Sequence, residues 1–324
     1  MHNTSVSDFA ATLQQQLAVI EERLMATVAT DWPFLTEVAQ HITGAGGKRF
    51  RPLLVCTAAN FGEPVADEDR ITAALAVELT HVASLYHDDV MDEAPLRRGA
   101  PSANDRWGNF IAIMAGDFLF ARASAMVAKL GADYVKLQAE TFGRLVKGQI
   151  AETVGPEDNE DRLEHYLQVI ADKTGSLIAT SAVFGGMISN ASDEVITALS
   201  KFGEEIGIVF QLSDDLIDIT SEHTGKTPGT DLREGVATLP TLLLQASTDP
   251  ADDELKALIT GDLSNDDDLA LALEKLRAHS VMEKAYNEVQ RRAELARNYL
   301  TPLPDCAAKD ALIQVCSDIV GRIN

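Results

Sequence analysis

The chain of 324 residues carries 27 lysines and arginines against 50 aspartates and glutamates, a formal net charge of −23. This excess of negative charge excludes nucleic acid as a partner, because binding to a phosphate backbone depends on surfaces rich in lysine and arginine. With 46% hydrophobic residues the chain can bury a sizeable core, which excludes an intrinsically disordered protein.

Cysteine usage and the lack of targeting signals indicate the compartment. The three cysteines, Cys56, Cys306 and Cys316, lack the paired spacing of a metal-binding finger and are predicted to be reduced, buried thiols. The first residues lack the basic segment and apolar run of a signal peptide, and no stretch reaches the roughly 18 to 20 apolar residues that span a bilayer. We expect a cytoplasmic protein without a transmembrane segment.

Apolar residues recur at helical spacing along almost the whole chain, as in Leu75, Leu79, Val82 and Tyr86. Glycine and proline gather at a few places, which are predicted to be loops: residues 44–47, 93–101, 155–158, 225–235 and 248–252. Acidic runs at 251–254 and 265–268 are typical of helix starts. The pattern predicts an all-α protein, a single domain over residues 1–324 with ten or more helices.

The first predicted loop is rich in positive charge. Its sequence Gly46-Gly47-Lys48-Arg49-Phe50-Arg51-Pro52 opens a helix, so that backbone N–H groups and the helix dipole favour an anion at the same place as three cations. In a chain so short of cations, this grouping indicates an anion-binding loop.

An aspartate motif follows at the end of a later predicted helix. Asp88, Asp89 and Asp92 form a DDxxD pattern, and helical spacing puts the three carboxylates on one side of a single turn. His81 lies two turns before Asp88 and is predicted to point toward the same cleft. His87 falls off that stripe and is interpreted as a packing residue.

A second DDxxD motif comprises Asp214, Asp215 and Asp218. Both motifs lie in apolar sequence, where like charges within one turn are costly unless a cation compensates them. Carboxylate oxygens suit Mg²⁺, which keeps several waters and completes its shell with substrate phosphates. Two such clusters predict a diphosphate held between them by bridging metal ions.

Arginine and lysine side chains near the motifs could bind such a diphosphate. Arg97 and Arg98 follow the first motif, and each offers forked hydrogen bonds that suit separate diphosphates. Further along, Lys173 and Lys226 each stand near a glycine, which is a weak signal by itself.

Taken together, these motifs resemble those of the trans-isoprenyl diphosphate synthases, the polyprenyl synthetase family, and most of all its bacterial medium- and long-chain members. The similarity runs in order through six segments: residues 46–52, 78–102, 116–123, 173–177, 210–218 and 225–235. It implies an isoprenoid synthase type I-like bundle of mostly antiparallel helices around a central cavity, in a homodimer. It also implies a prenyltransferase that joins isopentenyl diphosphate head to tail to an allylic diphosphate, either farnesyl or geranylgeranyl diphosphate, with about three Mg²⁺ ions in each active site.

The resemblance also implies a role for each matching residue. The metal ligands are Asp88, Asp89, Asp92, Asp214, Asp215 and Asp218. The allylic diphosphate is held by Arg97, Lys173 and Lys226, and isopentenyl diphosphate by Lys48, Arg51, His81 and Arg98. Thr174 and Gln211 match positions that line the reacting centre, and with Lys173 and Lys226 they form the catalytic group.

The sequence departs from the family pattern at one position. Val236 stands where many members carry a lysine that contacts the allylic diphosphate. Arg233, three residues earlier, is a hypothetical substitute for that lysine. An Arg233→Ala variant with unchanged kinetics for the allylic substrate would remove this hypothesis.

Small residues before the first motif bear on product length. Ala83 and Ser84 lie one turn before Asp88, where short-chain members of the family commonly carry an aromatic residue. We therefore expect a medium- or long-chain all-trans polyprenyl diphosphate, such as a quinone side-chain precursor. The alternative is that a bulky residue on the next helix, Met114 or Phe118, closes the tunnel, which would leave a short-chain synthase with a C15 to C20 product.

Other functions stay open at this point. A terpene cyclase also uses DDxxD and Mg²⁺, but it does not need the basic loop. A non-catalytic subunit of a heteromeric synthase usually lacks one aspartate cluster, and both clusters are intact here. A di-iron bundle needs paired Glu-x-x-His motifs, and only Glu78 and His81 form one. A long polyprenyl product is insoluble, so transient contact with a membrane is expected, although no basic amphipathic face supports it.

Overall fold

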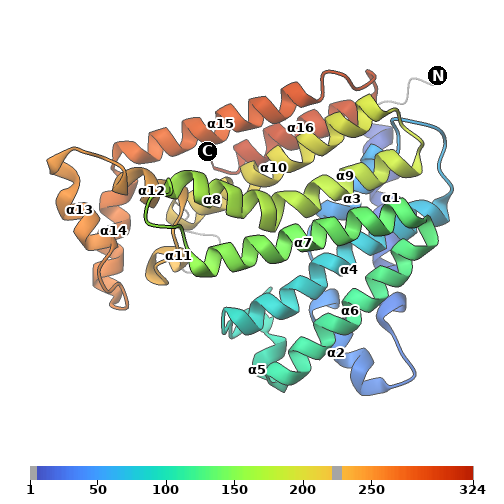
Figure 1. Cartoon of the computed structure of the whole chain (residues 1–324), viewed down its shortest axis with the longest axis horizontal. Coiled ribbons are helices and arrows are strands. Elements are labelled where there is room, and N and C mark those ends of the chain that lie inside the picture. Colours follow the sequence, from blue (N-terminus) through green and yellow to red (C-terminus); the bar gives the residue numbers. More distant parts are fainter. Residues whose placement is uncertain (1–5, 221–227, 324) are drawn as a thin grey trace. The chain divides into compact units, whose positions relative to one another are not determined.

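The structure is a computed structural model that describes residues 6–220 and 228–323 (Figure 1). Most of these residues lie in helices, and the strands β1 (Leu96–Arg97) and β2 (Ala100–Pro101) form one short antiparallel hairpin. The prediction of an all-α protein with ten or more helices is confirmed.

The prediction that all three cysteines are buried is wrong for one of them. Cys56 and Cys316 are buried within helices, whereas Cys306 is exposed just before α16 (Ala307–Gly321).

The chain divides into two compact units, and each is described by itself. The first unit comprises Met1–Gly143, Leu177–Ser200 and Pro302–Ala311. The second comprises Arg144–Ser176, Lys201–Thr301 and Leu312–Asn324. The expectation that residues 1–324 form a single domain stays a prediction.

Six helices lie wholly within the first unit: α1 (Val6–Val28), α2 (Pro33–Gly44), α3 (Phe50–Ala58), α4 (Asp67–Met91), α5 (Ala103–Trp107) and α6 (Asn109–Leu130). Four helices cross a unit boundary along the chain: α7 (Ala132–Val154), α9 (Ser176–Ile188), α10 (Asp193–Thr220) and α16 (Ala307–Gly321). The second unit holds α8 (Arg162–Ile170), the π-turn η1 (Ala171–Gly175), α11 (Thr230–Arg233), α12 (Leu239–Gln245), the 3₁₀-turn η2 (Pro250–Asp252), α13 (Asp253–Ile259), α14 (Asp266–Arg277) and α15 (Ser280–Tyr299).

The predicted helix starts and loops agree with these bounds. Asn265 caps α14 by accepting a hydrogen bond from the backbone N–H of Asp267, and the acidic run 266–268 fills the first turn. The runs of glycine and proline at 44–47, 155–158 and 248–252 fall at or between helix ends. The segment 93–101 differs from a plain loop, because it contains the β1–β2 hairpin. Part of the segment 225–235 lies outside the described residues, and the rest contains α11.

In the first unit the core forms around α4. Leu79, Val82 and Ala83 are fully buried, and α6 packs along α4. Gly116 of α6 makes this approach possible, because a Cβ there would lie 2.3 Å from Nε2 of His87. His87 packs on Phe120 with ring centroids 5.6 Å apart, which agrees with its interpretation as a packing residue.

In the second unit a hydrophobic cluster joins the end of α10 to the helices that follow. Ile219 of α10 packs with Leu232 of α11, Leu244 of α12 and the apolar faces of α13 and α14. This cluster anchors the C-terminal end of α10, which carries the second aspartate motif.

The helix α6 differs from the expectation that no segment is long and apolar enough to span a membrane. Among the described residues it meets that criterion by length and composition, and about a third of its most apolar stretch is buried in the protein. A core helix of a water-soluble protein also meets the criterion, so the finding is weak evidence for a membrane span.

Candidate active site

The β1–β2 hairpin positions Arg97 and Arg98. Its register pairs Arg97 with Ala100, so the two-residue turn is Arg98-Gly99. Both turn residues have positive φ angles, 53° and 79°, as a type I′ hairpin turn requires. Glycine adopts this conformation readily, whereas Arg98 is held there against its usual preference.

Arg97 is directed back onto the first aspartate motif. Its Nε and one terminal nitrogen both lie 2.5 Å from Oδ1 of Asp89, whose side chain is fully buried. Burial raises the pKa of Asp89, and the hydrogen bond from Arg97 opposes the shift. The other oxygen, Oδ2, is buried without a hydrogen-bond partner among the described residues.

Arg98 is directed toward the glycine loop between α2 and α3. Its guanidinium donates to the carbonyls of Ile42 and Gly46. A Cβ on Gly47 would lie only 3.3 Å from this guanidinium, and Gly47 has a φ of 153°. The glycines therefore give Arg98 room against the loop that carries Lys48 and Arg51.

Arg49, the middle cation of the loop, is turned into the protein. It is 7% exposed and forms ion pairs with Glu21 at 2.5 Å and with Glu78 at 2.8 Å. Its charge is therefore balanced, and Arg49 is unavailable to an anion. Of the three cations in the predicted anion-binding loop, Lys48 and Arg51 remain, and Lys48 is exposed.

Arg51, His81 and Arg98 form a group that we call the basic cluster. Burial lowers the pKa of Arg51 to about 10; the charge of Glu78 opposes this shift and that of Arg98 adds to it. Burial, followed by the charges of Arg51 and Arg98, holds the pKa of His81 well below its ordinary value of 6.5. The Nε of Arg51 is buried without a hydrogen-bond partner among the described residues. The cluster therefore carries an excess of positive charge, as a site that binds an anion requires.

The second motif lies at the C-terminal end of α10 and repeats the burial pattern of the first. Asp215 is buried and accepts hydrogen bonds from the hydroxyl of Tyr166 and from the backbone N–H of Leu239 at 3.0 Å. Burial raises the pKa of Asp215 to about 7, although these hydrogen bonds lower it. Asp214 pairs with Arg322 at 2.7 Å, and Asp218 accepts from the backbone N–H groups of Thr230 and Asp231.

The two motifs share a feature that helical spacing alone does not predict. In each, the second aspartate is buried, while the first and third are partly or fully exposed. The three carboxylates of a motif therefore do not lie in one environment. Among residues 6–220 and 228–323, no group of three His, Cys, Asp or Glu side chains is arranged to hold a metal ion. The donors still fit Mg²⁺, because all are carboxylate oxygens and one buried oxygen of Asp89 lacks a partner.

The π-turn η1 positions Lys173 and Thr174 in the second unit. Such turns are rare and occur often at functional sites. Lys173 pairs with Glu152 of α7 at 2.5 Å, and the neighbouring Asp172 accepts a hydrogen bond from Arg144 at 2.8 Å. Gln211 is half-buried one turn before Asp215 on α10. Lys226 lies outside the described residues.

The residues predicted to bind the two substrates belong to different units. The predicted isopentenyl diphosphate residues Lys48, Arg51, His81 and Arg98 all belong to the first unit. Of the allylic diphosphate group, Arg97 belongs to the first unit and Lys173 to the second.

One residue that contacts the second aspartate motif escaped the sequence analysis. Tyr166 donates its hydroxyl to Asp215, and no motif signals it because it precedes Asp215 by several elements.

The residues considered for product length lie on α4 and α6. Ala83 is fully buried, and Ser84, at 7% exposed, donates its hydroxyl to the carbonyl of His81. Met114 is 49% exposed, so it does not close a tunnel within its own unit. Phe118 is half-buried against Arg122.

Arg233 does not face the second motif in the described structure. Its guanidinium pairs with Asp266, at the start of α14, and Val236 is 43% exposed. The hypothesis that Arg233 replaces the missing lysine therefore requires this ion pair to open.

Known proteins similar to this chain define its family. The family model described as polyprenyl synthetase matches residues 33–276. Nonaprenyl diphosphate synthase of Mycobacterium tuberculosis is 44% identical over 317 residues, covering 97% of this chain and 94% of the relative. The structure of geranylgeranyl pyrophosphate synthase from Corynebacterium glutamicum, complexed with calcium and isoprenyl diphosphate, matches with a TM-score of 0.88, 45% identity and 98% coverage of both chains. Decaprenyl diphosphate synthase from Rhodobacter capsulatus matches with a TM-score of 0.87, 30% identity and coverage of 99% of this chain and 100% of that one.

The helical fold and the two aspartate motifs define an all-α isoprenoid synthase of type I. The chain belongs to the polyprenyl synthetase family, and it is a prenyltransferase. Enzymes of this family use Mg²⁺.

Proposed function

We propose that this enzyme condenses isopentenyl diphosphate head to tail with an allylic diphosphate, farnesyl or geranylgeranyl diphosphate, to make a medium- or long-chain all-trans polyprenyl diphosphate. The basic cluster carries this proposal. Arg51, His81 and Arg98 converge beside the Arg97–Asp89 ion pair within one unit, so that an anion site adjoins a carboxylate motif. A cyclase that takes only one diphosphate has no use for a second anion site.

The cluster suits the diphosphate of isopentenyl diphosphate, which does not leave in the reaction. Arg98 and Arg51 bring two positive charges, and Lys48 adds a third from the exposed loop. His81 is neutral at neutral pH, because its pKa is lowered, and it can donate one hydrogen bond to a phosphate oxygen. These residues bind and orient isopentenyl diphosphate, which is the nucleophile of the reaction.

The allylic diphosphate belongs with the aspartates and with Arg97, Lys173 and Lys226. Asp88, Asp89 and Asp92 of the first motif and Asp214, Asp215 and Asp218 of the second would each hold metal ions, about three Mg²⁺ ions in all. Bound Mg²⁺ supplies positive charge that stabilises the departing diphosphate. Lys173 and Lys226 add fixed cations, and Thr174 and Gln211 present oxygens to the reacting carbons.

In the reaction, the C–O bond of the allylic diphosphate breaks and both of its electrons leave with the diphosphate. The double bond of isopentenyl diphosphate then forms the new C–C bond to the allylic cation. Loss of one proton from the isopentenyl part restores a double bond, and the departed diphosphate is the proposed base. Water must be excluded meanwhile, and the apolar residues of α4 below the first motif suit this task.

Product length is proposed from the small side chains Ala83 and Ser84. The relatives include a nonaprenyl, a decaprenyl and a geranylgeranyl synthase, so similarity alone does not select a length. Since neither position carries an aromatic ring, a tail can pass along α4. A quinone side-chain precursor is the proposed product, and transient contact with a membrane for its release stays a prediction, as does a cytoplasmic location.

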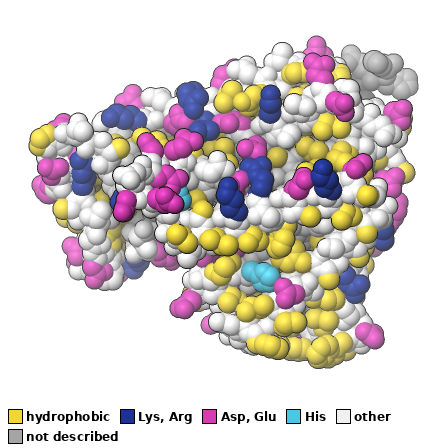
Figure 2. All heavy atoms as spheres, viewed as in Figure 1, with side chains coloured by type: hydrophobic (Ala, Val, Ile, Leu, Met, Phe, Trp, Pro, Cys, Tyr) yellow, Lys and Arg dark blue, Asp and Glu magenta, His cyan; other side chains and the backbone are white. Residues whose placement is uncertain are grey.

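A homodimer is proposed on the outer face of α6. Phe110, Ile113 and Met114 are 75%, 42% and 49% exposed, and Figure 2 shows hydrophobic side chains gathered over this helix. An exposed apolar face of this kind typically marks an interaction surface, and a second copy of the chain is the proposed partner. This burial would also explain why α6 is as apolar as a membrane span.

The test is to incubate the purified protein with Mg²⁺, labelled isopentenyl diphosphate and either farnesyl or geranylgeranyl diphosphate, and to size the products. A series of chains that ends at C30 or longer supports the proposal, and an end at C15 or C20 supports the short-chain alternative. No incorporation by folded protein would contradict the proposed activity and favour the non-catalytic subunit. Size-exclusion chromatography with light scattering tests the dimer.

A further inference from the structure

The π-turn η1 contacts two helices of the second unit, α7 and α10, through positions that have no side chain. A Cβ on Gly175 of η1 would lie 3.0 Å from the carbonyl oxygen of Glu204 on α10. A Cβ on Gly148 of α7 would lie 3.1 Å from the Cβ of Asp172 in η1. Both helices therefore approach η1 closely, and a polar contact between the three elements can be short.

Arg144 of α7 makes this polar contact with a single side chain. Its Nε donates to Oδ1 of Asp172 in η1 at 2.8 Å, and its Nη1 donates to Oε2 of Glu204 on α10 at 2.8 Å. The guanidinium presents its donors in a rigid planar fork, so the two bonds fix the two carboxylates relative to each other. Arg144 therefore ties η1 to the same residue of α10 against which Gly175 packs.

The carboxylate of Asp172 distinguishes this contact from an ordinary surface ion pair, because its side chain is only 5% exposed. Burial raises the pKa of Asp172, but hydrogen bonds from Arg144 and Gln168 and the charges of Arg144 and Lys147 lower it on balance. Lys147 is the weaker partner, because its Nζ is 3.5 Å from Oδ2 and its side chain is 72% exposed. Without Arg144, a buried negative charge loses most of its compensation, and η1 must shift to bring that charge to water.

The geometry of η1 makes its position important for the side chains that it carries. The backbone N–H of Ser176 bonds to the carbonyl of Ala171, five residues earlier, whereas an α-helix bonds residues four apart. The wider turn changes the directions in which Lys173 and Thr174 leave the helix. A shift of η1, or its return to α-helical geometry, therefore redirects both side chains.

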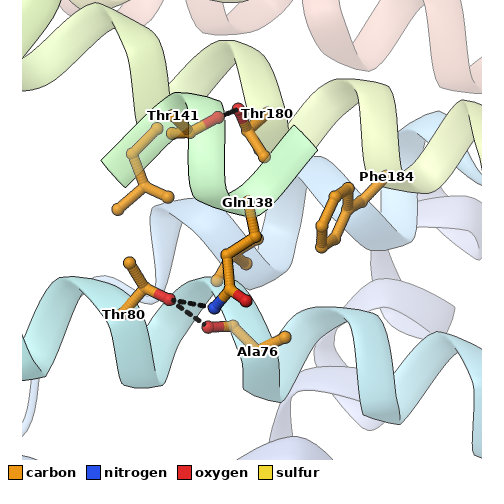
Figure 3. Close-up of a pocket in the computed structure, with 8 residues that line it drawn as sticks. Ala76, Thr80, Gln138, Thr141, Thr180 and Phe184 are labelled. Atoms are coloured by element: carbon orange, nitrogen blue, oxygen red, sulfur yellow. Dashed lines mark hydrogen bonds between the residues drawn. The ribbon is translucent and has the colours of Figure 1, made fainter. Parts of the chain in front are cut away.

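The turns of α7 that precede Arg144 are held by hydrogen bonds within the first unit. Nε2 of Gln138 donates to Oγ1 of Thr80 on α4 at 3.2 Å, and the hydroxyls of Thr141 and Thr180 of α9 lie 2.6 Å apart. Figure 3 shows these side chains reaching between the helices. These contacts fix the part of α7 that leads to Arg144.

We propose that Arg144 is a positioning residue for the prenyl transfer, which holds η1 so that Lys173 and Thr174 face the allylic diphosphate. This inference rests on the proposed function, and Arg144 itself is assigned no contact with a substrate. Its effect concerns binding of the allylic diphosphate and the step in which that diphosphate leaves. Binding of isopentenyl diphosphate is unaffected, because the residues proposed to bind it belong to the first unit.

Steady-state kinetics of Arg144→Gln test this role, because glutamine cannot bridge two carboxylates. We expect kcat to fall about tenfold or more and KM for the allylic substrate to rise by a similar factor, with KM for isopentenyl diphosphate within about twofold of the wild type. Arg144→Lys keeps the charge without the fork and should recover part of the activity. Arg291→Gln is the matched control, because Arg291 is 58% exposed and pairs with Glu288 of its own helix, α15.

Hydrogen exchange measures the restraint on η1 independently of activity. In Arg144→Gln the backbone amides of residues 171–176 should exchange about tenfold faster than in the wild type, and those of α14 and α15 should be unchanged. Glu204→Gln removes one of the two contacts and should have a smaller effect. The Arg144→Gln/Glu204→Gln double variant should match Arg144→Gln, because both substitutions act through one guanidinium.

The outcomes separate this inference from the proposed function. If the wild type extends the starter and a folded Arg144→Gln keeps wild-type exchange and kinetics, the inference is overturned. Equal increases in both KM values, or a lower melting temperature with unchanged kinetics, also overturn it, because they show a general structural role. If the wild type incorporates no isopentenyl diphosphate, the proposed function is wrong, and hydrogen exchange alone decides whether Arg144 restrains η1. If Arg144→Gln does not fold, Arg144→Lys takes its place in both measurements.

Discussion

A Cβ atom on Gly148 would lie 2.7 Å from the backbone nitrogen of Lys173, closer than real Cβ atoms approach another heavy atom. Because Gly148 of α7 has no side chain, the π-turn η1 can lie against that helix. Through this contact, Gly148 holds the segment that carries Lys173 and Thr174 in place.

Gly148→Ala should displace η1. We expect a loss of about 1–3 kcal/mol in the free energy of unfolding, typical of overpacking, and a fall in kcat of about tenfold or more. Urea denaturation and steady-state kinetics measure the two effects. Gly143→Ala is the control, because a Cβ there meets no atom within 4 Å, and it should stabilise the helix by about 0.5–1 kcal/mol. A Gly148→Ala enzyme with the wild-type kcat would contradict the positioning role.

Arg98→Ala should raise KM for isopentenyl diphosphate and leave KM for the allylic substrate nearly unchanged. Hydrogen bonds to charged groups contribute about 1.5–3 kcal/mol, so the expected increase is about tenfold to a hundredfold. Arg106→Ala is the matched control, because Arg106 pairs with Glu37 on the surface and stacks 4.2 Å from the ring centre of Trp107. Equal increases in both KM values would show that Arg98 does not discriminate between the two diphosphates.

Removal of divalent metal with a chelator should abolish activity without unfolding the protein. The buried aspartates keep partners that are independent of metal, Arg97 for Asp89 and Tyr166 for Asp215. Circular dichroism and activity, measured with the chelator and after Mg²⁺ is restored, separate the two effects.

At the level of single residues, Asp88→Asn should raise the Mg²⁺ concentration needed for half-maximal rate. Asp117→Asn on α6, whose side chain is 56% exposed, should not. Equal Mg²⁺ dependence in both variants would exclude Asp88 as a ligand.

His81 should make the protein less stable in mild acid. Burial and the charges of Arg51 and Arg98 hold its pKa in the folded state well below 6.5, so between these values only the unfolded chain binds the proton. Stability is therefore complete above pH 6.5 and is lost as the pH falls below it, by up to about 1.4 kcal/mol per pH unit.

Urea denaturation of the wild type and of His81→Gln from pH 8 to pH 5 isolates this contribution as the difference between the two slopes. The comparison is needed because Asp215, whose burial raises its pKa to about 7, contributes a slope of opposite sign in both proteins. An unchanged slope in the variant would show that His81 takes up its proton equally in both states.

Ser84→Phe should shorten the product. Ser84 lies on the same face of α4 as Thr80 and Asp88, so an aromatic ring there obstructs the proposed tail path. Ala83→Phe should also shorten it, but Ala83 is fully buried where α6 approaches, so a cost in stability is expected as well. Chromatographic sizing of the products checks both variants, and an unchanged length in a folded Ser84→Phe enzyme would contradict this tunnel route.

Much of the fold could be read from local patterns. Helical periodicity, the acidic run at the start of α14 and the glycine loop after α2 each depend on a few neighbouring residues, and the structure agrees with them. The aspartate motifs and Arg97 and Arg98 were also visible, because like charges and paired arginines are conspicuous in apolar or cation-poor sequence. These features depend on spacing along one element, which the sequence states directly.

Contacts between segments that are distant in the sequence could not be predicted from local patterns. The inward turn of Arg49 depends on Glu21 and Glu78, and the burial of Asp215 depends on Tyr166 and Leu239. No periodicity encodes these partners, because each belongs to a different element.

By itself, then, the sequence determined the helical class, the loops and the residue types of a diphosphate and metal site, since these follow from local spacing and charge. Only the tertiary structure decided which cations remain available, which aspartate of each motif is buried, and that Gln138 reaches Thr80. The reason is physical: burial and pairing set the charge and mobility of a group, and both depend on what packs against it in three dimensions.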